Sequence, residues 1–367
     1  MRVFLTVLLF TVALWAQPVT IPLLPPGPGN PRNTEGDFLA LRDGRILLVY
    51  TKFTSDGPMD SGSAMLAART SLDQGASWSS TDDVILENEA QMNVMSVTLR
   101  RLGNGHIGLF YLRKNSMLDC RPYLRTSRDE GKTWSKPRLL VKEPGYWILN
   151  NDRISVLRDG TLVMPLALHR NTSADPKQFN RKGVAMTYQS RNHGKSWKRS
   201  STILEHPTGD PSGLQEPGVV ELKDGRLLMY MRTASGSQYF AYSSDQGKTW
   251  GAASPSPLLS PLSPASIERI PKTGDLLAVW NNHADVNDTI RNRLRTPLTV
   301  ALSRDEGKTW THHKNLADAP DGWYCYTAIE FAGERVLLSY NSGNSQLGRL
   351  SRNVITYFDL AWLYRAN

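Results

Sequence analysis

The 367-residue sequence is poor in cysteine, with Cys120 and Cys325 as its only two. Two cysteines exclude the dense disulfide framework on which many small secreted domains depend. One bond between them could form in an oxidising compartment. The sequence leaves open whether they pair, because spacing along the chain does not give their separation in the fold.

The sequence also lacks the signatures of several kinds of binding site. It has no motif for a metal, a nucleotide or a flavin, and its seven histidines are scattered. The formal net charge of +9 favours an acidic ligand, but no run of lysines and arginines indicates nucleic acid. We therefore expect no cofactor, no metal and no nucleic-acid partner.

Long apolar runs are absent except at the N-terminus. Met1-Arg2 precedes a 13-residue apolar core, Val3 to Trp15, which ends at Ala16-Gln17. This pattern is typical of a signal peptide, and the core is too short to span a bilayer well. We expect residues 1–16 to be removed on export and residues 17–367 to form one domain. The mature protein is then secreted or periplasmic, without a membrane span.

Long helical periodicity is absent too, and a short turn pattern recurs in its place. The pattern S-x-D/N-x-G-x-S/T-W occurs five times, with starts 53 to 63 residues apart. Asp or Asn bonds nearby backbone N–H groups, Gly takes the positive φ of a tight turn, and Trp packs over it. We therefore expect these turns to be fold devices and not catalytic groups. The five copies are Ser71–Trp78, Ser127–Trp134, Ser190–Trp197, Ser243–Trp250 and Ser303–Trp310.

Before, between and after these copies, six apolar stretches each meet a turn and continue as a second apolar stretch. A short turn between β-rich runs is a strong hairpin signal, above all when it reads Asp-Gly or Asn-Gly. Six units of two hairpins predict an all-β fold, a six-bladed β-propeller of four-stranded antiparallel blades. Only the sixth unit lacks the Asp-containing turn. The six hairpin turns are Asp43-Gly44, Asn104-Gly105, Asp159-Gly160, Asp224-Gly225, Thr273-Gly274 and Gly333-Glu334.

Strand parity predicts which face of such a propeller is functional. The hairpin turn joins the first and second strands of a blade and the Asp-containing turn joins the third and fourth, so both lie on one face. The opposite face carries the starts of the inner strands, where propellers present an axial mouth, and also Asp60, Arg232 and Arg295. A ring of polar residues there could merely solvate a wet channel, but carboxylates, arginines and a tyrosine together favour a site. The residues that open the six inner strands are Glu35, Asn93, Asp152, Glu216, Ser266 and Tyr326.

Several short motifs carry a resemblance to a known family. They are Gln215-Glu216-Pro217, Met231-Arg232-Thr233, Arg295-Thr296-Pro297-Leu298, Tyr326-Thr327, Gln91-Met92-Asn93 and the Pro58–Ser63 loop around Asp60. With the repeated Asp-containing turns, they make the chain similar to the sialidase (neuraminidase) superfamily of six-bladed propellers. The resemblance implies that Tyr326 is the nucleophile, Glu216 its base and Asp60 the acid/base residue. It also implies that Arg232 and Arg295 bind a substrate carboxylate and that Asn93 contributes from the second blade.

Two departures from the family pattern concern substrate binding. The family's first arginine stands in an Arg-Ile-Pro segment, where this chain reads Thr-Glu-Gly-Asp around Glu35. Only two of three family arginines therefore have counterparts, and Arg32 or Arg153 could supply the third. Asn150–Arg153 replaces a Gly-rich segment of the family, which leaves Asp152 and Glu35 as further candidate substrate contacts.

The chemistry of this set suits an acidic sugar. A carboxylate on the anomeric carbon would repel the carboxylate nucleophile of most retaining glycosidases, whereas a neutral tyrosine avoids repulsion but needs a neighbouring base. The resemblance implies an exo-acting, retaining glycoside hydrolase that removes a terminal sialic acid, or a related ulosonic or uronic acid, from a glycan or glycoconjugate. Two alternatives stay open. One is a sialidase-fold glycosidase of another specificity, in which Glu35 bonds sugar hydroxyls. The other is a non-catalytic propeller that binds glycan or protein, in which Glu216 and Arg232 form a structural ion pair.

Overall fold

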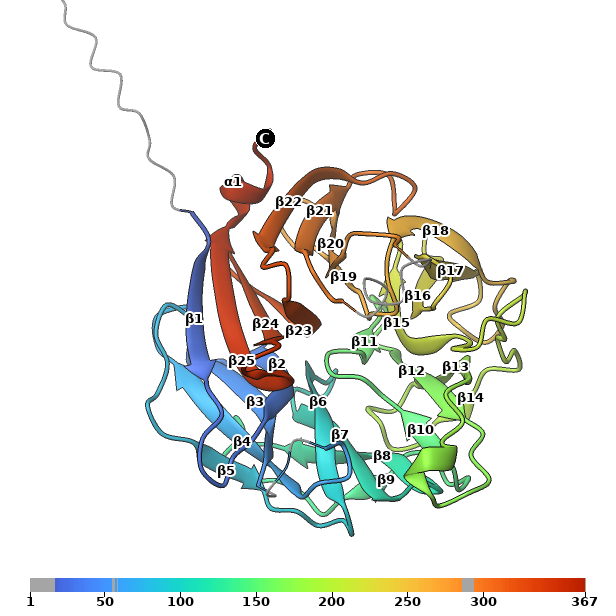
Figure 1. The fold of residues 1–367 in the computed structure, drawn as a ribbon, viewed down its shortest axis with the longest axis horizontal. Helices are drawn as coiled ribbons and strands as arrows, with labels where there is room; N and C mark the ends of the chain where they lie inside the picture. Colours follow the sequence, from blue (N-terminus) through green and yellow to red (C-terminus); the bar gives the residue numbers. More distant parts are fainter. Residues whose placement is uncertain (1–16, 55–56, 58, 286–293, 367) are drawn as a thin grey trace, which may run out of the picture.

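The computed structural model describes residues 17–54, 57, 59–285 and 294–366. The segment expected to be a signal peptide, residues 1–16, lies outside the described residues. In the described part, regular structure is β-strand except for the 3₁₀ turn η1 (Pro176–Gln178) and the short helix α1 (Leu360–Leu363). The strands form sheets arranged around a central axis (Figure 1).

The sheets correspond to six four-stranded blades, as predicted. Four blades are separate sheets, and the other two are joined into one nine-stranded sheet. Blade 1 consists of β2 (Asn33–Ala40), β3 (Ile46–Phe53), β4 (Ala64–Ser71) and β5 (Asp83–Leu86). Blade 2 consists of β6 (Asn93–Arg101), β7 (Ile107–Ser116), β8 (Asp119–Ser127) and β9 (Arg138–Leu139). Blade 3 consists of β11 (Ser155–Val156), β12 (Leu162–His169), β13 (Gly183–Ser190) and β14 (Lys198–Arg199).

The remaining blades follow the same order, with the first strand nearest the axis (Figure 1). Blade 4 consists of β15 (Gln215–Glu221), β16 (Leu227–Arg232), β17 (Ser237–Ser243) and β18 (Ser254–Leu259). Blade 5 consists of β19 (Ser266–Arg269), β20 (Leu276–Asn281), β21 (Leu298–Ser303) and β22 (Thr311–Ala317). Blade 6 consists of β23 (Trp323–Ala332), β24 (Arg335–Asn344), β25 (Gly348–Asp359) and β1 (Val19–Leu24).

Blade 6 combines strands from both ends of the described chain. Its outermost strand, β1, pairs antiparallel with β25, so that Val19 lies opposite Tyr357. Because the third and fourth strands of this blade are not consecutive in the chain, no turn connects them. This explains why the sixth sequence unit has no Asp-containing turn.

The short strand β10 (Tyr146–Ile148) was not predicted by the hairpin pattern. It pairs parallel with β8, where Tyr146 lies opposite Cys120, and antiparallel with β12, where Tyr146 lies opposite His169. The strand therefore joins blades 2 and 3 into one sheet.

The Asp-containing turns share one hydrogen-bond pattern. In the second copy the Ser127 hydroxyl donates to Oδ1 of Asp129 at 2.7 Å, and the Thr133 N–H donates to the same carboxylate at 2.9 Å. Gly131 takes a φ of 85°, in the left-handed region that favours glycine. The tryptophan that ends the pattern is buried in the fourth and fifth copies and half-buried in the other three. These turns stabilise the fold, as expected.

Both kinds of turn lie on one face, because they contact each other between neighbouring blades. Glu306, in the fifth Asp-containing turn, accepts a hydrogen bond at 2.7 Å from the N–H of Lys223, beside the hairpin turn of blade 4. Glu130, in the second, accepts one at 3.0 Å from the N–H of Arg42, beside the hairpin turn of blade 1. The strand-parity argument therefore holds, and the inner strands begin at the opposite face.

The core lies between neighbouring blades. Leu48 of β3 packs against Leu337 of β24 and Ile355 of β25, for example, in a cluster that joins blades 1 and 6. Cys120 and Cys325 are both buried and both free, so the disulfide bond that the sequence left open is not formed.

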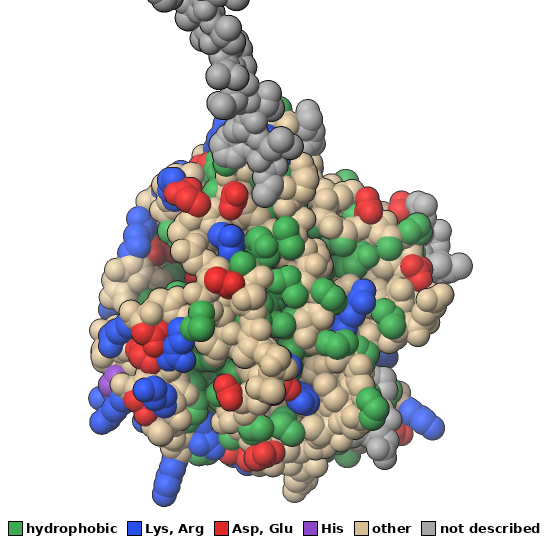
Figure 2. Space-filling model, turned by 90° about the vertical axis from the view of Figure 1, so that its left-hand side faces the viewer, with side chains coloured by type: hydrophobic (Ala, Val, Ile, Leu, Met, Phe, Trp, Pro, Cys, Tyr) green, Lys and Arg blue, Asp and Glu red, His purple; other side chains and the backbone are tan. Residues whose placement is uncertain are grey.

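On the side of the molecule shown in Figure 2, Lys and Arg side chains are interspersed with Asp and Glu around an area of hydrophobic side chains. None of the helices in the described residues is long and apolar enough to cross a membrane.

Candidate active site

Four inner strands carry a β-bulge at the same place, and each bulge holds one residue in the left-handed conformation. The pairing register shifts around Glu35, Ser96, Glu216 and Tyr326. Their φ angles are 47°, 61°, 47° and 57°. A bulge interrupts the alternation of a strand and re-aims a side chain, often beside an active site. Here the four side chains line one pocket at the axis.

Blade 2 differs from the prediction at this point. Strand β6 begins at Asn93, as expected, but the bulge residue that lines the pocket is Ser96. Asn93 is buried, and its Nδ2 donates to the carbonyls of Asp60 and Gly62, each at 2.8 Å. Asn93 therefore positions the loop that carries Asp60, and we no longer assign it to substrate contact.

The cavity brings together six of the side chains that the sequence singled out. Its main part has a volume of about 440 Å³, and a narrower inner part has about 80 Å³. A cavity of this size can enclose a small ligand. Glu35 lines the inner part, and the main part is lined by Asp60, Glu216, Arg232, Arg295 and Tyr326.

Tyr326 and Glu216 form the centre of the cavity. The Tyr326 hydroxyl donates to Oε1 of Glu216 at 3.3 Å, and Nη1 of Arg232 lies 2.8 Å from the same oxygen. Burial acts to raise the pKa of Glu216, but the charges of Arg232 and Arg295 outweigh it and the pKa is lowered. Burial, and then the charge of Glu216, raise the pKa of Tyr326. At neutral pH the pair is therefore a neutral phenol beside an ionised carboxylate, which can serve as its base.

Arg295 offers donors to a ligand in this cavity. Its guanidinium carbon lies 5.4 Å from the ring centroid of Tyr326 and 4.9 Å from that of Trp323. The side chain is buried, and within the described structure its Nε and Nη1 have no hydrogen-bond partner. Arg295 also forms no ion pair among the described residues although it lines the cavity, so a bound carboxylate would stabilise its buried charge.

Asp60 stands at the mouth of the cavity, held by two cations. Nη1 of Arg32 donates to its Oδ1, and Nζ of Lys114 donates to its carbonyl oxygen at 3.0 Å. Burial acts to raise the pKa of Asp60, but the charges of Arg32 and Lys114 outweigh it and lower the pKa to about 2. Since 62% of the side chain is also reached by solvent, Asp60 is ionised at neutral pH.

Arg32 lies behind Asp60 and does not line the cavity. Only 1% of the residue is exposed, its guanidinium packs 4.7 Å from the ring centroid of Phe53, and its Nη2 lies 3.4 Å from Oε1 of Glu35. With both carboxylates bound to it, Arg32 holds Asp60 in place. A substrate carboxylate reaches this guanidinium only if Asp60 moves away.

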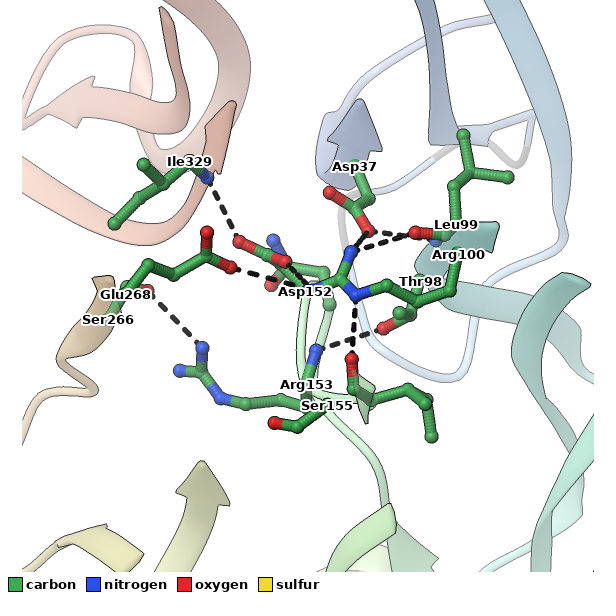
Figure 3. Close-up of polar contacts among 12 residues, drawn as sticks. Asp37, Thr98, Leu99, Arg100, Asp152, Arg153, Ser155, Ser266, Glu268 and Ile329 are labelled. Atoms are coloured by element: carbon green, nitrogen blue, oxygen red, sulfur yellow. Dashed lines mark hydrogen bonds and ion pairs between the residues drawn. The ribbon is translucent and has the colours of Figure 1, made fainter. Parts of the chain in front are cut away.

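Asp152 belongs to a separate network on the axis, built around Arg100 (Figure 3). Its Oδ1 accepts from Nη2 of Arg100, and its Oδ2 accepts from the N–H of Ile329 in blade 6 at 2.9 Å. Arg100 also contacts Asp37 at 2.9 Å and Glu268 at 3.5 Å. Asp152 thus connects blades 2, 3 and 6 and does not line the cavity around Tyr326, so the expectation of a substrate contact is dropped.

Arg153 is also committed to the fold. Its Nη1 donates to the hydroxyl of Ser266 at 3.2 Å (Figure 3), and its Nη2 donates to the carbonyl of Ala265 at 2.7 Å. Its guanidinium carbon lies 5.4 Å from the ring centroid of Tyr230, and the residue is buried. Neither of the two arginines considered for the missing clamp therefore lines the cavity, since Arg32 lies behind Asp60 and Arg153 is bound to blade 5.

Sequence reasoning missed one wall of the cavity. Tyr146, His169, Phe179 and Arg181 line it beside Glu216. A signal for His169 existed, because it ends the second strand of its blade, the same position that identified Arg232 in blade 4. Tyr146 had no such signal, since β10 lies outside the hairpin pattern. Among the described residues, no group of three or more His, Cys, Asp or Glu side chains is placed to hold a metal ion.

Comparisons with known proteins agree with this architecture. The family model of the BNR repeat-like domain matches residues 87–337. A sialidase from Bacteroides fragilis (strain YCH46) is 30% identical over 213 residues, which cover 54% of this chain and 35% of that protein. A sialidase from Micromonospora viridifaciens is 24% identical over 331 residues, which cover 79% of this chain and 47% of that protein. The chain thus matches between a third and a half of the length of these relatives.

The solved structure of Trypanosoma rangeli sialidase has the same fold. The TM-score is 0.72 at 15% sequence identity, and the match covers 95% of this chain and 60% of that one. At this identity the likeness concerns the fold alone, but the family model covers more than half of this chain. The chain therefore belongs to the BNR repeat-like family, within the sialidase superfamily.

Proposed function

We propose that this protein is an exo-acting, retaining glycoside hydrolase that removes a terminal acidic sugar from a glycan or glycoconjugate. The observation that carries the proposal is the contact of 3.3 Å between the Tyr326 hydroxyl and Glu216, made inside a cavity that also contains Asp60 and Arg295. A phenol is a weak nucleophile at neutral pH, and a carboxylate in hydrogen-bond contact can activate it by acting as a general base.

The reaction takes place in two steps. In the first, the Tyr326 oxygen forms a bond to the anomeric carbon while the glycosidic C–O bond breaks. The phenolic proton passes to Glu216, and the leaving oxygen takes a proton from Asp60. In the second, Asp60 takes a proton from water as the water oxygen attacks the anomeric carbon, and the departing Tyr326 oxygen recovers its proton from Glu216.

Asp60 must gain a proton before the first step, although its pKa is about 2 in this structure. A bound substrate supplies two effects that favour this. It excludes water from the cavity mouth, and its carboxylate adds a negative charge close to Asp60, so both effects raise the pKa. The charge of Arg32 opposes the protonation of Asp60, because it lowers the pKa of this carboxyl. The Arg32–Asp60 pair therefore determines the pH range in which Asp60 can donate a proton.

The carboxylate of the substrate would bind Arg295 and Arg232, since guanidinium groups bind carboxylates in bidentate fashion. Arg232 is already paired with Glu216, and Arg32 with Asp60 and Glu35. We therefore expect weaker carboxylate binding than three available arginines would give, and poorer activity on aryl sialosides than on some other acidic sugar.

A second candidate is a glycosidase of the same mechanism for a different sugar. It is favoured by Glu35, which lies in the inner part of the cavity where it can accept hydrogen bonds from sugar hydroxyls. The N-terminal pattern of residues 1–16 supports a place of action outside the cytoplasm, as part of the same proposal.

A panel of aryl glycosides tests the proposal. The panel contains sialosides, other ulosonosides, uronosides and neutral glycosides, each assayed with the wild type and with Tyr326→Phe. We expect release of the aryl group from at least one acidic glycoside, and its loss in the variant. Activity on neutral glycosides alone would replace the acidic-sugar assignment by the second candidate. Absence of activity on the whole panel would favour a non-catalytic propeller.

A further inference from the structure

An aromatic wall lines one side of the cavity. Its residues have no role in the reaction described above. The Phe179 ring lies 4.9 Å from that of Tyr146 and 5.1 Å from that of His169, between ring centroids. All three residues line the main cavity, together with Arg181. Aromatic faces beside hydrogen-bonding groups suit a ligand that has both apolar and polar surfaces, as a sugar ring has.

The hydrogen bonds of His169 fix the role of each ring nitrogen. Nδ1 lies 2.9 Å from the carbonyl oxygen of Asn180. A carbonyl oxygen only accepts, so Nδ1 must carry the proton. In the neutral ring, Nε2 is then an acceptor with a free lone pair. The contacts of the described residues give Nε2 no protein partner.

The Asn180 carbonyl is held firmly enough to set this tautomer. The Asn180 N–H donates to Oδ1 of Asn171 at 2.7 Å, and its Nδ2 donates to the carbonyl of Arg170 at 3.2 Å. The loop that follows β12 is therefore closed on itself beside His169. Burial lowers the pKa of His169, ahead of the opposing effects of the Asn180 carbonyl and Glu216, so the ring is neutral near pH 7.

We propose that His169 is a specificity-determining residue of this cavity, whose Nε2 accepts a hydrogen bond from a hydroxyl of the bound sugar. The inference rests on the proposed function, since it needs a sugar in the cavity. The hydroxyl donates to Nε2 while Phe179 and Tyr146 contact the apolar surface beside it. An ether or a carbonyl at the same position has no proton to donate and leaves the acceptor unsatisfied.

Two variants of His169 separate this role from a structural one. His169→Asn places an amide N–H where Nδ1 was and retains the bond to Asn180, but has nothing at the position of Nε2. His169→Gln places an amide oxygen near the position of Nε2 and gives up the bond to Asn180. The ligand contact therefore survives in the Gln variant, and the structural contact survives in the Asn variant.

The experiment is isothermal titration with 2-deoxy-2,3-dehydro-N-acetylneuraminic acid and with a set of its analogues that each lack one hydroxyl. We expect one analogue to bind the wild type roughly 10-fold more weakly than the parent, the usual effect of one lost hydrogen bond in a cavity. His169→Asn should bind the parent and this analogue equally, at the weaker affinity. His169→Gln should retain most of the discrimination but melt at a lower temperature.

The outcomes are distinguishable. If the wild type does not bind the parent at all, sialic acid is excluded as the sugar of this cavity and the inference fails, whereas the other acidic sugars of the proposed function are tested separately by the panel of aryl glycosides. If the wild type binds the parent and His169→Asn still discriminates against the same analogue, the inference alone is overturned. The same holds if the loss in affinity follows the melting temperature, so that the Gln variant loses more than the Asn variant.

Discussion

The hydroxyl of Tyr326 donates to Glu216 at 3.3 Å, although the two residues are 110 positions apart and belong to blades 6 and 4. Both sit in β-bulges with positive φ, at 57° and 47°. Such a backbone conformation costs roughly 1–3 kcal/mol for a residue other than glycine. Both residues nevertheless adopt this conformation, and as a result the side chains of Tyr326 and Glu216 point toward each other from two different blades.

Tyr326→Phe should remove activity without unfolding the protein. The ring and its packing stay, but the nucleophilic oxygen is lost, so we expect kcat on the best acidic substrate to fall by about 10³-fold or more. Circular dichroism and melting temperature should stay close to those of the wild type. An unchanged kcat would show that Tyr326 is an ordinary core tyrosine.

Glu216→Gln should lose a similar factor, because an unassisted phenol with a pKa near 10 is rarely ionised at neutral pH. The amide keeps the size of the side chain but cannot take the phenolic proton. Since the two residues act as one unit, the double variant should be no slower than either single one. Losses that multiply in the double variant would mean that the residues act independently.

Asp60→Asn should be selective for the leaving group. General acid catalysis contributes roughly 10²- to 10⁴-fold, and we expect most of that loss for alkyl or sugar leaving groups. Nitrophenyl or fluorophenyl leaving groups need little protonation, so their first step should continue. The measurement is kcat/KM across a series of aryl leaving groups, plotted against leaving-group pKa. A loss that is equal for all members of the series would exclude Asp60 as the acid.

Arg32 should set the pH range of this acid. Its charge helps to lower the pKa of Asp60 to about 2, and the acid form is needed for substrates with poor leaving groups. In Arg32→Gln the pKa of Asp60 rises toward its ordinary value, so the alkaline limb of the kcat/KM profile should move to higher pH. Arg32→Lys keeps the positive charge and should move the limb less. If the alkaline limb of the kcat/KM profile stays in place in both variants, the group that titrates there is not Asp60.

The network around Arg100 predicts a pH-dependent stability. Burial, and then the charge of Asp152, raise the pKa of Glu268 well above its ordinary value, against the effect of Arg100. Glu268 has the weakest pairing in the network, at 3.5 Å from Arg100, so it is the carboxyl that we expect to hold a proton. Protonated Glu268 contributes to the free energy of unfolding. This contribution is fully present below the pKa of a glutamate in the unfolded chain, near 4, and is lost as the pH rises through the higher pKa in the folded protein.

Glu268→Gln removes this titration, because the amide is neutral at every pH. The variant should gain stability over the wild type between pH 5 and pH 8, by roughly 1 kcal/mol. Urea unfolding of both proteins at the two pH values measures the difference. If the difference is the same at pH 5 and pH 8, Glu268 is ionised throughout.

The tryptophans of the Asp-containing turns should differ in their contribution to stability. Trp310 is 9% exposed, so Trp310→Ala should cost about 3–5 kcal/mol, the usual range for a buried aromatic. Trp134 is only half-buried at the equivalent place, and Trp134→Ala should cost less. Chemical denaturation compares the two. An equal effect would mean that packing of the ring does not determine the stability of the turn.

The fold could be predicted from the sequence because hairpin turns and Asp-containing turns repeat along the chain. Part of the site could not be predicted, because it depends on the β-bulges of the inner strands. Alternating apolar residues and Gly-containing turns give strands and hairpins directly. A bulge adds one residue to a strand without changing its composition, so position in the strand could not distinguish Asn93 from Ser96. The structure assigns the pocket position to Ser96 and leaves Asn93 under the Asp60 loop.

Opening an inner strand was also too coarse a criterion for function. Asp152 and Tyr326 are both predicted to open an inner strand. In the structure Tyr326 lies within β23, whereas Asp152 precedes β11, bonds Arg100 and Ile329 and takes no part in the cavity. Which side of the axis a side chain reaches depends on its neighbours in space, and those come from other blades. His169 ends the second strand of blade 3, as Arg232 ends that of blade 4, but a single histidine at a strand end carries no signal comparable to an arginine that can bind a carboxylate.

The most direct test of the account is covalent labelling with a fluorinated analogue of the sugar that the wild type hydrolyses best. Fluorine beside the anomeric carbon slows both steps, and a good leaving group restores the first, so the glycosyl-enzyme accumulates. Digestion and mass spectrometry should then find the label on one peptide, at Tyr326, and Tyr326→Phe should take up none. Label on Asp60, Glu35 or Glu216, or rapid turnover of a fully inverted product without any label, would contradict the tyrosine-nucleophile account.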